Sequence, residues 1–206
     1  MNRVIPLGIL ALAILAFATL LLVILPGIQI RTEPPTPGLE PYSAAELRGR
    51  DIYVSQGCLY CHSQQPRSLD QAPDAERGWG RASVASDYFY DQPHQLGTMR
   101  TGPDLQNVGA RLPSRDWHLT HLYQPRAVFD WSIMPAYPYL FEIKDKAGRG
   151  DVVVAMPEGY APAGKVVVAR SQALDLVAYL KSLDRTFPAP RAGLRDDGYS
   201  ERGEPR

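Results

Sequence analysis

The residues best suited to chemistry stand together in the run Cys58-Leu-Tyr-Cys61-His62. Two thiols three positions apart can each add to one vinyl group of a haem, and a histidine directly after the second cysteine can then ligate the iron. The spacing therefore predicts one covalently bound haem c, with thioether bonds to Cys58 and Cys61 and with His62 as an axial ligand.

Two other kinds of site also use a Cys-x-x-Cys pair. A structural zinc site needs four ligands, and the chain has no cysteine besides these two. A dithiol redox pair gives no reason for the histidine that follows, and it usually lies in a βαβ setting that this sequence does not indicate. The pattern favours haem attachment over both.

A methionine sulfur is the second axial ligand that we expect, because thioether ligation raises the reduction potential relative to nitrogen ligation. Met134 lies in Ser132-Ile-Met-Pro-Ala-Tyr137, a predicted loop between two helical segments, and it is the predicted ligand. Met156 also precedes a proline but falls in a predicted hairpin. Met99 precedes Arg100 before a tight turn and is the weakest candidate.

The remaining histidines have weaker claims to a functional role. His118 and His121 stand three apart on a predicted helix, a spacing that metal ligands use, but no carboxylate or cysteine partner accompanies them. We expect them to pack at the surface or around the ligands, and His94 to be a loop residue. With both iron positions filled and no pairing of nucleophile and base, the sequence predicts no catalytic residue.

The composition excludes some classes of protein. The 206 residues carry 22 basic and 22 acidic side chains, so no basic surface is available for a nucleic acid. Of the 22 residues Val4–Leu25, 19 are apolar and none is charged, whereas the rest is polar and rich in proline and glycine. This contrast argues against both a polytopic membrane protein and a purely soluble one.

The apolar run is long enough to cross a bilayer, which takes ~20 helical residues. A signal peptide usually has an apolar core of ~7–15 residues before a small-x-small cleavage site. Here the tidy triplet Ala16-Phe-Ala18 lies in the middle of the run, which we expect to close at Pro26-Gly27. We therefore predict an uncleaved anchor over residues 1–30. Arg3 weakly favours an inside N-terminus and an outside domain.

Three further regions follow the anchor. Residues 31–41 hold four prolines and predict a stiff, extended linker. Residues 42–187 would form the cytochrome domain. Residues 188–206 form a tail with eight charged residues in nineteen.

Local patterns predict the elements of the domain. A capping box at Ser43-Ala-Ala-Glu46 predicts a helix through about Ser55. The polar stretch Ser63–Met99 has no sustained period and predicts a long ordered excursion. The other predicted elements are a short helix over Ser114–Tyr123 ended by Pro125, a small hairpin over Asp151–Val154 and Lys165–Ala169, and a helix over Ser171–Asp184 whose stripe is Ala173, Leu176, Val177, Leu180 and Leu183.

The order of helix, CxxCH motif, late Met-Pro and apolar last helix resembles class I cytochromes c. The sequence more specifically resembles the mono-haem subunit (subunit II) of cbb-type haem–copper cytochrome oxidases. The matching blocks are Gly49-Arg-Asp-Ile-Tyr53, Cys58-Leu-Tyr-Cys-His-Ser-Gln64, Tyr90-Asp-Gln-Pro93, Arg100-Thr-Gly-Pro-Asp-Leu105, Trp117-His118, His121-Leu122, Gln124-Pro-Arg126 and Met134-Pro-Ala-Tyr-Pro138. Departures from the usual family pattern include Gln65-Pro66, His94 and Ile133.

The resemblance implies a fold and site roles. The fold would be mainly α: a single N-terminal transmembrane helix and a class I cytochrome c-like domain with a long loop excursion and a small β-hairpin. Gly49 and Tyr53 on the first domain helix would cross Leu176, Tyr179 and Leu180 on the last. Cys58 and Cys61 would hold the haem, His62 and Met134 the iron, and the carbonyl of Pro103 would orient His62.

The implied function is a one-electron relay in a bacterial inner membrane, with the haem domain on the periplasmic side. A donor cytochrome c would supply electrons, and a haem–copper catalytic subunit would use them to reduce dioxygen. We expect the excursion, with its aromatic residues Trp79, Tyr88, Phe89 and Tyr90, to dock with the membrane helix on that subunit. Alternatives are the small cytochrome subunit of a nitric-oxide reductase, an anchored haem sensor and a peroxidase.

Overall fold

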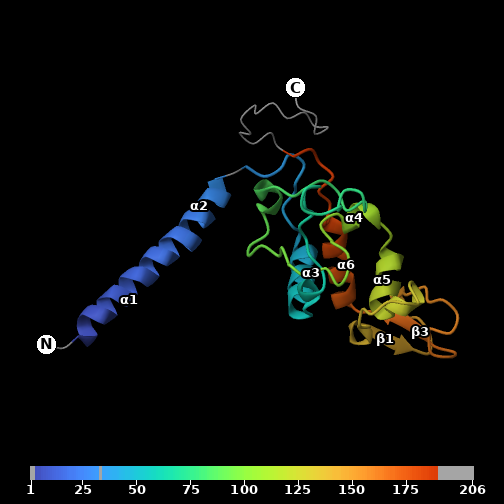
Figure 1. Cartoon of the computed structure of the whole chain (residues 1–206). Coiled ribbons are helices and arrows are strands. Elements are labelled where there is room, and N and C mark those ends of the chain that lie inside the picture. The colour runs from blue at the N-terminus through green and yellow to red at the C-terminus, as the bar shows by residue number, and fades with distance from the viewer. Residues whose placement is uncertain (1–2, 33, 190–206) are drawn as a thin grey trace, which may run out of the picture. The chain divides into compact units, whose positions relative to one another are not determined.

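The computed structural model describes residues 3–32 and 34–189 (Figure 1). The chain divides into two compact units. One contains the described residues before Glu40, the segment Val84–Gln92 and the described residues after Phe187; the other contains Glu40–Ser83 and Pro93–Phe187. Most of the predicted tail, from residue 190 on, lies outside the described residues. The predicted domain boundaries stay a prediction.

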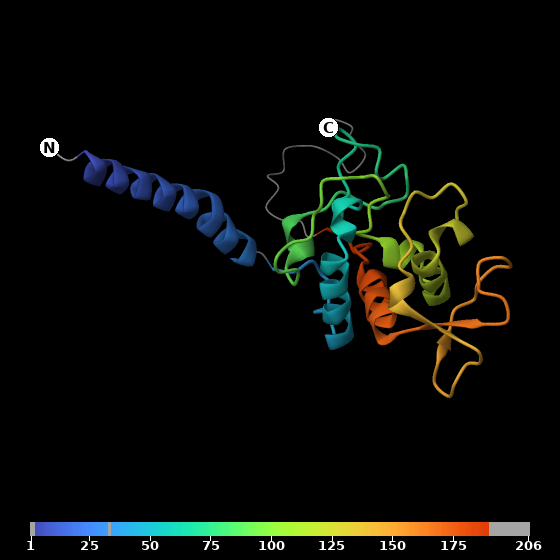
Figure 2. The ribbon, with the colours of Figure 1, turned by 90° about the horizontal axis from the view of Figure 1, so that it is seen from below.

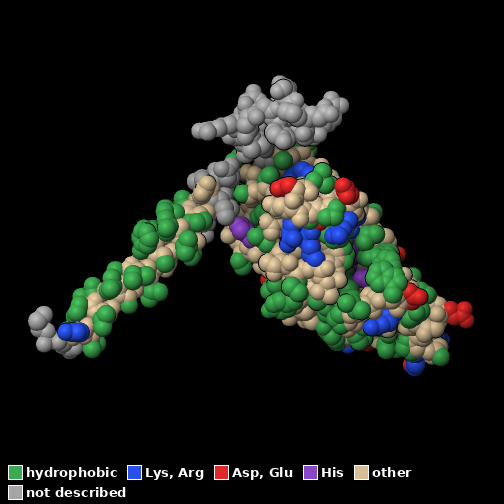
Figure 3. All heavy atoms as spheres, in the orientation of Figure 1, with side chains coloured by type: hydrophobic (Ala, Val, Ile, Leu, Met, Phe, Trp, Pro, Cys, Tyr) green, Lys and Arg blue, Asp and Glu red, His purple; other side chains and the backbone are tan. Residues whose placement is uncertain are grey.

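The first unit begins with one long apolar helix. Its parts are α1 (Val4–Thr19), the π-helical turn η1 (Leu20–Ile24) and α2 (Leu25–Thr32). Within the segment Val4–Gln29 an 18-residue window has a mean hydropathy of 3.0 and none of that window is buried, so the length and composition of the helix suffice to cross a membrane. Hydrophobic side chains cover the visible face of this helix (Figure 3).

The prediction that this helix closes at Pro26-Gly27 is wrong. Proline has no N–H to donate to the carbonyl four residues earlier, and its ring crowds that carbonyl. The helix accommodates Pro26 by widening into a π turn just before it, where the N–H of Leu25 donates to the carbonyl of Leu20, five residues back. The helix therefore continues to Thr32.

The proline-rich linker is not extended throughout. Residues 36–39 make a turn in which the N–H of Leu39 donates to the carbonyl of Thr36 at 2.9 Å. The buried hydroxyl of Thr36 donates to a carboxylate oxygen of Asp87 at 2.7 Å, and its N–H donates to the carbonyl of Ser86 at 3.3 Å. Long-range hydrogen bonds of this kind cannot be seen in a local pattern.

Two helices form the centre of the second unit. In α3 (Ala44–Ser55) the predicted capping box is confirmed, because Ser43 and Glu46 bond each other's backbone N–H through their side chains. The predicted last helix is α6 (Ser171–Ser182), and all five residues of its predicted stripe are buried. The two helices lie side by side in both views (Figures 1 and 2).

Gly49 allows α3 and α6 to approach closely. A Cβ atom at this position would lie 1.9 Å from the carbonyl oxygen of Asp175 and 2.8 Å from Cβ of Tyr179. The rings of Tyr53 and Tyr179 pack beside it with centroids 5.4 Å apart. The predicted contact of Gly49 and Tyr53 with the last helix is therefore confirmed at Tyr179.

Shorter elements complete the second unit. The predicted helix over Ser114–Tyr123 is α5 (Arg115–Tyr123), whose first turn is capped by the hydroxyl of Ser114. It is preceded by α4 (Val108–Arg111). The other short helices among the described residues are the 3₁₀ turns η2 (Cys58–Tyr60), η3 (Ala85–Tyr88, in the first unit), η4 (Pro125–Ala127) and η5 (Pro138–Leu140).

The small sheet has three strands rather than two. The predicted hairpin is present as β2 (Val152–Val153) antiparallel to β3 (Val166–Ala169). A further strand, β1 (Phe141–Lys144), pairs with the other edge of β3, with Phe141 opposite Ala169, so the order is β1-β3-β2. In β1 only Ile143 is β-branched, so local pattern gave a weak strand signal. The mainly helical class is confirmed, and the cytochrome c-like fold stays a prediction.

Candidate haem site

The CxxCH motif forms a tight turn at the end of α3. Gly57 begins it with φ = 72°, a left-handed conformation that favours glycine. The N–H groups of Cys61 and His62 then both donate to the carbonyl of Cys58, at 3.1 and 3.0 Å. This turn gathers the two thiols and the imidazole on one short piece of backbone.

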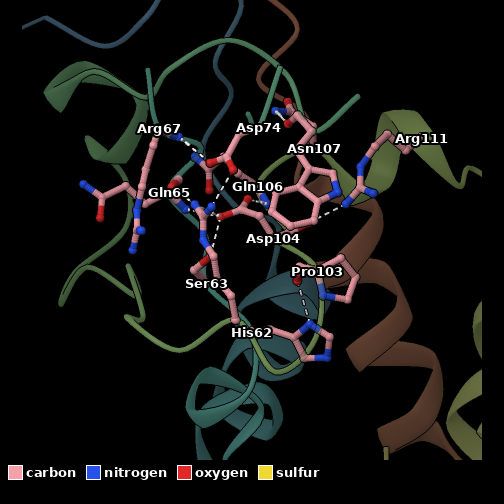
Figure 4. Close-up of polar contacts among 12 residues, drawn as sticks. His62, Ser63, Gln65, Arg67, Asp74, Pro103, Asp104, Gln106, Asn107 and Arg111 are labelled. Atoms are coloured by element: carbon pink, nitrogen blue, oxygen red, sulfur yellow. Dashed lines mark hydrogen bonds and ion pairs between the residues drawn. The ribbon is translucent and has the colours of Figure 1, made fainter. Parts of the chain in front are cut away.

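The imidazole of His62 is held from one side by a second loop. Its Nδ1 donates a hydrogen bond of 2.8 Å to the carbonyl oxygen of Pro103, and the other ring nitrogen lies on the far side of the ring (Figure 4). A Cβ atom at Gly102 would lie 2.3 Å from the ring, so the approach requires glycine. Burial lowers the pKa of His62, which favours the neutral imidazole that can ligate a metal.

The two thiols differ in environment. Cys58 is half-buried and Cys61 is exposed, and both are free. Burial raises the pKa of the Cys58 thiol to about 11. Redox-active dithiols need a thiol with a depressed pKa, because the thiolate is the nucleophile. Cys58 is therefore not activated as the attacking thiolate of a dithiol redox pair.

The three candidate methionines fall into two groups. Met99 is 56 % exposed. Met134 and Met156 are both half-buried and pack against the hydrophobic core of the second unit. The loop that carries Met134 is attached to α5 by a 2.9 Å hydrogen bond from the N–H of Tyr137 to the carbonyl of Leu122.

The backbone beside His62 is joined to the Pro103 loop by several bonds. The N–H of Gly102 donates to the carbonyl of Cys61 at 2.9 Å, and the N–H of Leu105 donates to the carbonyl of Ser63 at 2.8 Å. The hydroxyl of Ser63 donates to the buried carboxylate of Asp104 at 2.6 Å. Ser63 and Asp104 lie inside the blocks Cys58–Gln64 and Arg100–Leu105, but no sequence pattern predicts a role for either side chain.

Gln64 connects the motif to the last helix. It is buried, and its amide nitrogen donates to the hydroxyl of Tyr179 on α6 at 3.1 Å. Because Tyr179 also packs on Tyr53 of α3, the motif is fixed to both central helices. The only sequence signal for this linking role of Gln64 was its position directly after His62-Ser63.

The two histidines on α5 take part in packing. His118 is buried, and its Nε2 donates to the carbonyl of Leu112 at 2.8 Å. The ring of His121 stacks on Trp117 with centroids 4.8 Å apart, and burial lowers its pKa to about 4. Among residues 3–32 and 34–189, no group of three His, Cys, Asp or Glu side chains could hold a metal ion.

Three observations test whether these residues fit a haem. The donor set includes the His62 imidazole, whose Nδ1 bonds the Pro103 carbonyl, and two methionine side chains that pack against the core. The absence of a side chain at Gly102 leaves the space that the His62 ring fills. Within the described part of the chain, Nδ1 of His121 and Nε of Arg111 are buried without a hydrogen-bond partner. Haem carboxylates could satisfy such groups, so the residues fit the cofactor.

Comparison with known proteins gives one result. The model of a family described as cytochrome c oxidase, mono-heme subunit/FixO, matches residues 2–156, well over half of the chain. A search of curated proteins finds no match.

Proposed function

Because the chain belongs to the FixO family of mono-heme subunits of cytochrome c oxidase, we propose that it is the membrane-anchored subunit that relays single electrons to the catalytic subunit. The observation that carries the proposal is the CxxCH turn whose histidine donates through Nδ1 to the Pro103 carbonyl. This bond orients the imidazole and increases its basicity as a ligand.

Each part of the site has a proposed task. Cys58 and Cys61 would hold the haem by thioether bonds, and His62 would ligate the iron through Nε2. Met134 would supply the sulfur ligand from the loop attached to α5. When bound, the haem supplies a one-electron iron couple whose potential depends on its ligands and their hydrogen bonds.

The proposed setting is a bacterial inner membrane crossed once by the N-terminal helix, with the second unit and its haem on the periplasmic side. Electrons would come from another cytochrome c subunit or a soluble cytochrome c, and they would pass to a haem–copper subunit that reduces dioxygen to water. The helix and the excursion would dock on that subunit. In the excursion, Tyr88 is buried and Phe89 and Tyr90 are half-buried. These three rings therefore expose less surface for docking than the sequence led us to expect.

The family match supports an oxidase subunit over the small subunit of a nitric-oxide reductase. An anchored haem sensor or a peroxidase would need a vacant iron position, which a methionine ligand would close. An optical spectrum separates these classes, because a His/Met haem shows a near-infrared sulfur–iron band and a five-coordinate haem does not.

The proposal is tested on the purified native assembly. Acid–acetone extraction should leave the colour of this chain with the polypeptide, because two thioethers bind the haem covalently. Oxygen consumption by the assembly should then depend on this subunit. Colour that moves wholly into the organic phase, or undiminished oxygen consumption without the subunit, would contradict the proposal.

A further inference from the structure

The guanidinium group of Arg100 joins the segments on both sides of the His62–Pro103 contact. Its Nε donates to the hydroxyl of Ser63 at 3.1 Å and its Nη2 to the carbonyl of Gln65 at 2.8 Å. Its Nη1 donates to a carboxylate oxygen of Asp74 at 2.5 Å, and Asp104 lies 3.6 Å from Nη2. Figure 4 shows Ser63, Gln65, Asp74 and Asp104 close to one another above the His62–Pro103 contact.

The carboxylate of Asp104 connects the same two backbone segments. One of its oxygens accepts from the hydroxyl of Ser63 at 2.6 Å and from the N–H of Gln65 at 2.8 Å. The other accepts from the N–H of Gln106 at 2.9 Å. Ser63 directly follows His62, and Asp104 directly follows Pro103. The carboxylate therefore ties the backbone beside the His62 imidazole to the backbone beside the Pro103 carbonyl.

Burial makes Arg100 important to this arrangement, because it is the cation that faces both buried carboxylates. The carboxylates of Asp74 and Asp104 are fully buried, and the Arg100 side chain is 14 % exposed. A buried carboxylate without a partner is strongly destabilising. Burial acts to raise the pKa of Asp74, but hydrogen bonds from Arg100 and the Arg67 backbone outweigh it and hold the pKa below its ordinary value.

The flat face of Trp79 completes the position of the guanidinium. Arg100 lies over this ring at 5.3 Å from its centroid, and Arg77 lies over it at 5.0 Å. Arg77 is exposed and shares the ring contact. The chain thus offers two arginines on one indole, of which Arg100 reaches the backbone of the haem motif.

We propose that Arg100 is a positioning residue for the axial ligand: through Ser63 and Asp104 it sets the strength of the His62–Pro103 hydrogen bond, and thereby the reduction potential of the haem. The inference rests on the proposed haem site. A stronger bond from Nδ1 makes the imidazole a more electron-donating ligand, which stabilises ferric iron and lowers the potential.

The direction in which the reduction potential shifts distinguishes a positioning role of Arg100 from an effect of its charge. Loss of the Arg100 cation, acting through charge alone, would favour the more positive oxidised site and lower the potential. Loss of positioning would weaken the His62–Pro103 bond, reduce donation to the iron and raise the potential. The two explanations therefore predict opposite shifts for one substitution.

The experiment uses the full-length, haem-loaded chain with Arg100→Gln, Arg100→Lys and the control Arg77→Gln. We expect Arg100→Gln to raise the potential, Arg100→Lys to raise it less and Arg77→Gln to leave it unchanged. In the reduced protein, the Nδ1 proton of His62 should exchange with solvent about tenfold faster in Arg100→Gln, the change that ~1.4 kcal/mol produces in an equilibrium.

A lowered or unchanged potential with unaltered exchange of the His62 proton would overturn the proposal. If Arg100→Gln does not accumulate, Ser63→Ala decides the question, since it removes the hydroxyl that Arg100 and Asp104 share and should also raise the potential. A wild-type chain without covalent haem would refute the proposed function, whereas a normal wild type with unresponsive variants would refute the role of Arg100 alone.

Discussion

At the scale of single residues, the site depends on the two ring nitrogens of the His62 imidazole. Nδ1 of His62 is occupied by the Pro103 carbonyl, which fixes the tautomer and makes Nε2 the nitrogen that can ligate iron. The neighbouring Cys58 thiol, with its pKa raised to about 11, is a protonated group at neutral pH. The raised pKa of Cys58 argues against its acting as the attacking thiolate of a dithiol redox pair.

The proposal that Met134 is the sulfur ligand can be tested with a matched pair of substitutions. Met134→Ala should remove the near-infrared sulfur–iron band, lower the reduction potential and allow carbon monoxide to bind, because the iron loses its thioether. Met156→Ala is the control, since Met156 is also half-buried against the same core. If the Met156 variant lost the band and the Met134 variant kept it, the assignment would be wrong.

At the scale of elements, the close crossing of α3 and α6 holds the backbone of the CxxCH motif in place. The CxxCH turn follows α3 directly, and Gln64 bonds Tyr179 on α6. A bidentate ion pair of Arg48 with Asp175, with two hydrogen bonds of 2.8 Å, joins the same helices. It acts together with the apolar and close backbone packing at Gly49 to hold the crossing.

Gly49→Ala should destabilise the protein although alanine is the better helix former. Alanine would favour an exposed helix position by about 1 kcal/mol over glycine. Here the new methyl group would meet backbone of α6 at 1.9 Å, and overpacking of this kind costs ~1–3 kcal/mol or more. Urea unfolding measures the net loss. Leu47→Ala, at an exposed position of α3, should change stability far less, and equal losses would contradict the packing argument.

At the scale of the whole molecule, the proposed function requires the apolar helix to hold the second unit near a membrane. Tethering raises the effective concentration of one partner near another, so a subunit held in this way meets a membrane-embedded acceptor more often than a free one would. The helix is continuous from Val4 through Thr32 and passes Pro26 without ending. The helix is therefore longer than the apolar run Val4–Leu25 from which it was predicted.

Deletion of residues 1–30 should separate haem binding from relay. We expect a water-soluble chain with a six-coordinate haem, because the site residues all lie in the other unit, and we expect the remaining subunits to lose oxygen consumption with it. The intact chain is the control, and its mass should include the anchor. A mature chain that starts near residue 30 and keeps full activity would show that the helix is a cleaved signal sequence.

Much of this protein follows from local sequence. The CxxCH motif, the capping box at Ser43, the stripe of α6 and the apolar N-terminal run are each short-range patterns with one favoured structure, and the structure contains the corresponding helices. The end of the first helix was mispredicted because a proline's effect depends on whether neighbouring turns can widen. Strand β1 was missed because pairing with β3, not its own residues, makes it a strand.

The tertiary structure decided what surrounds the motif. Gly102 is required because the His62 ring packs on it, and Gly49 because α6 lies against it; neither approach can be read from the residues alone. Arg100 and Asp74 lie 26 positions apart and meet because the excursion folds back on the motif. Chemistry that depends on covalent spacing is visible in sequence, whereas the position of a carbonyl or a guanidinium within a few ångströms depends on the folded chain.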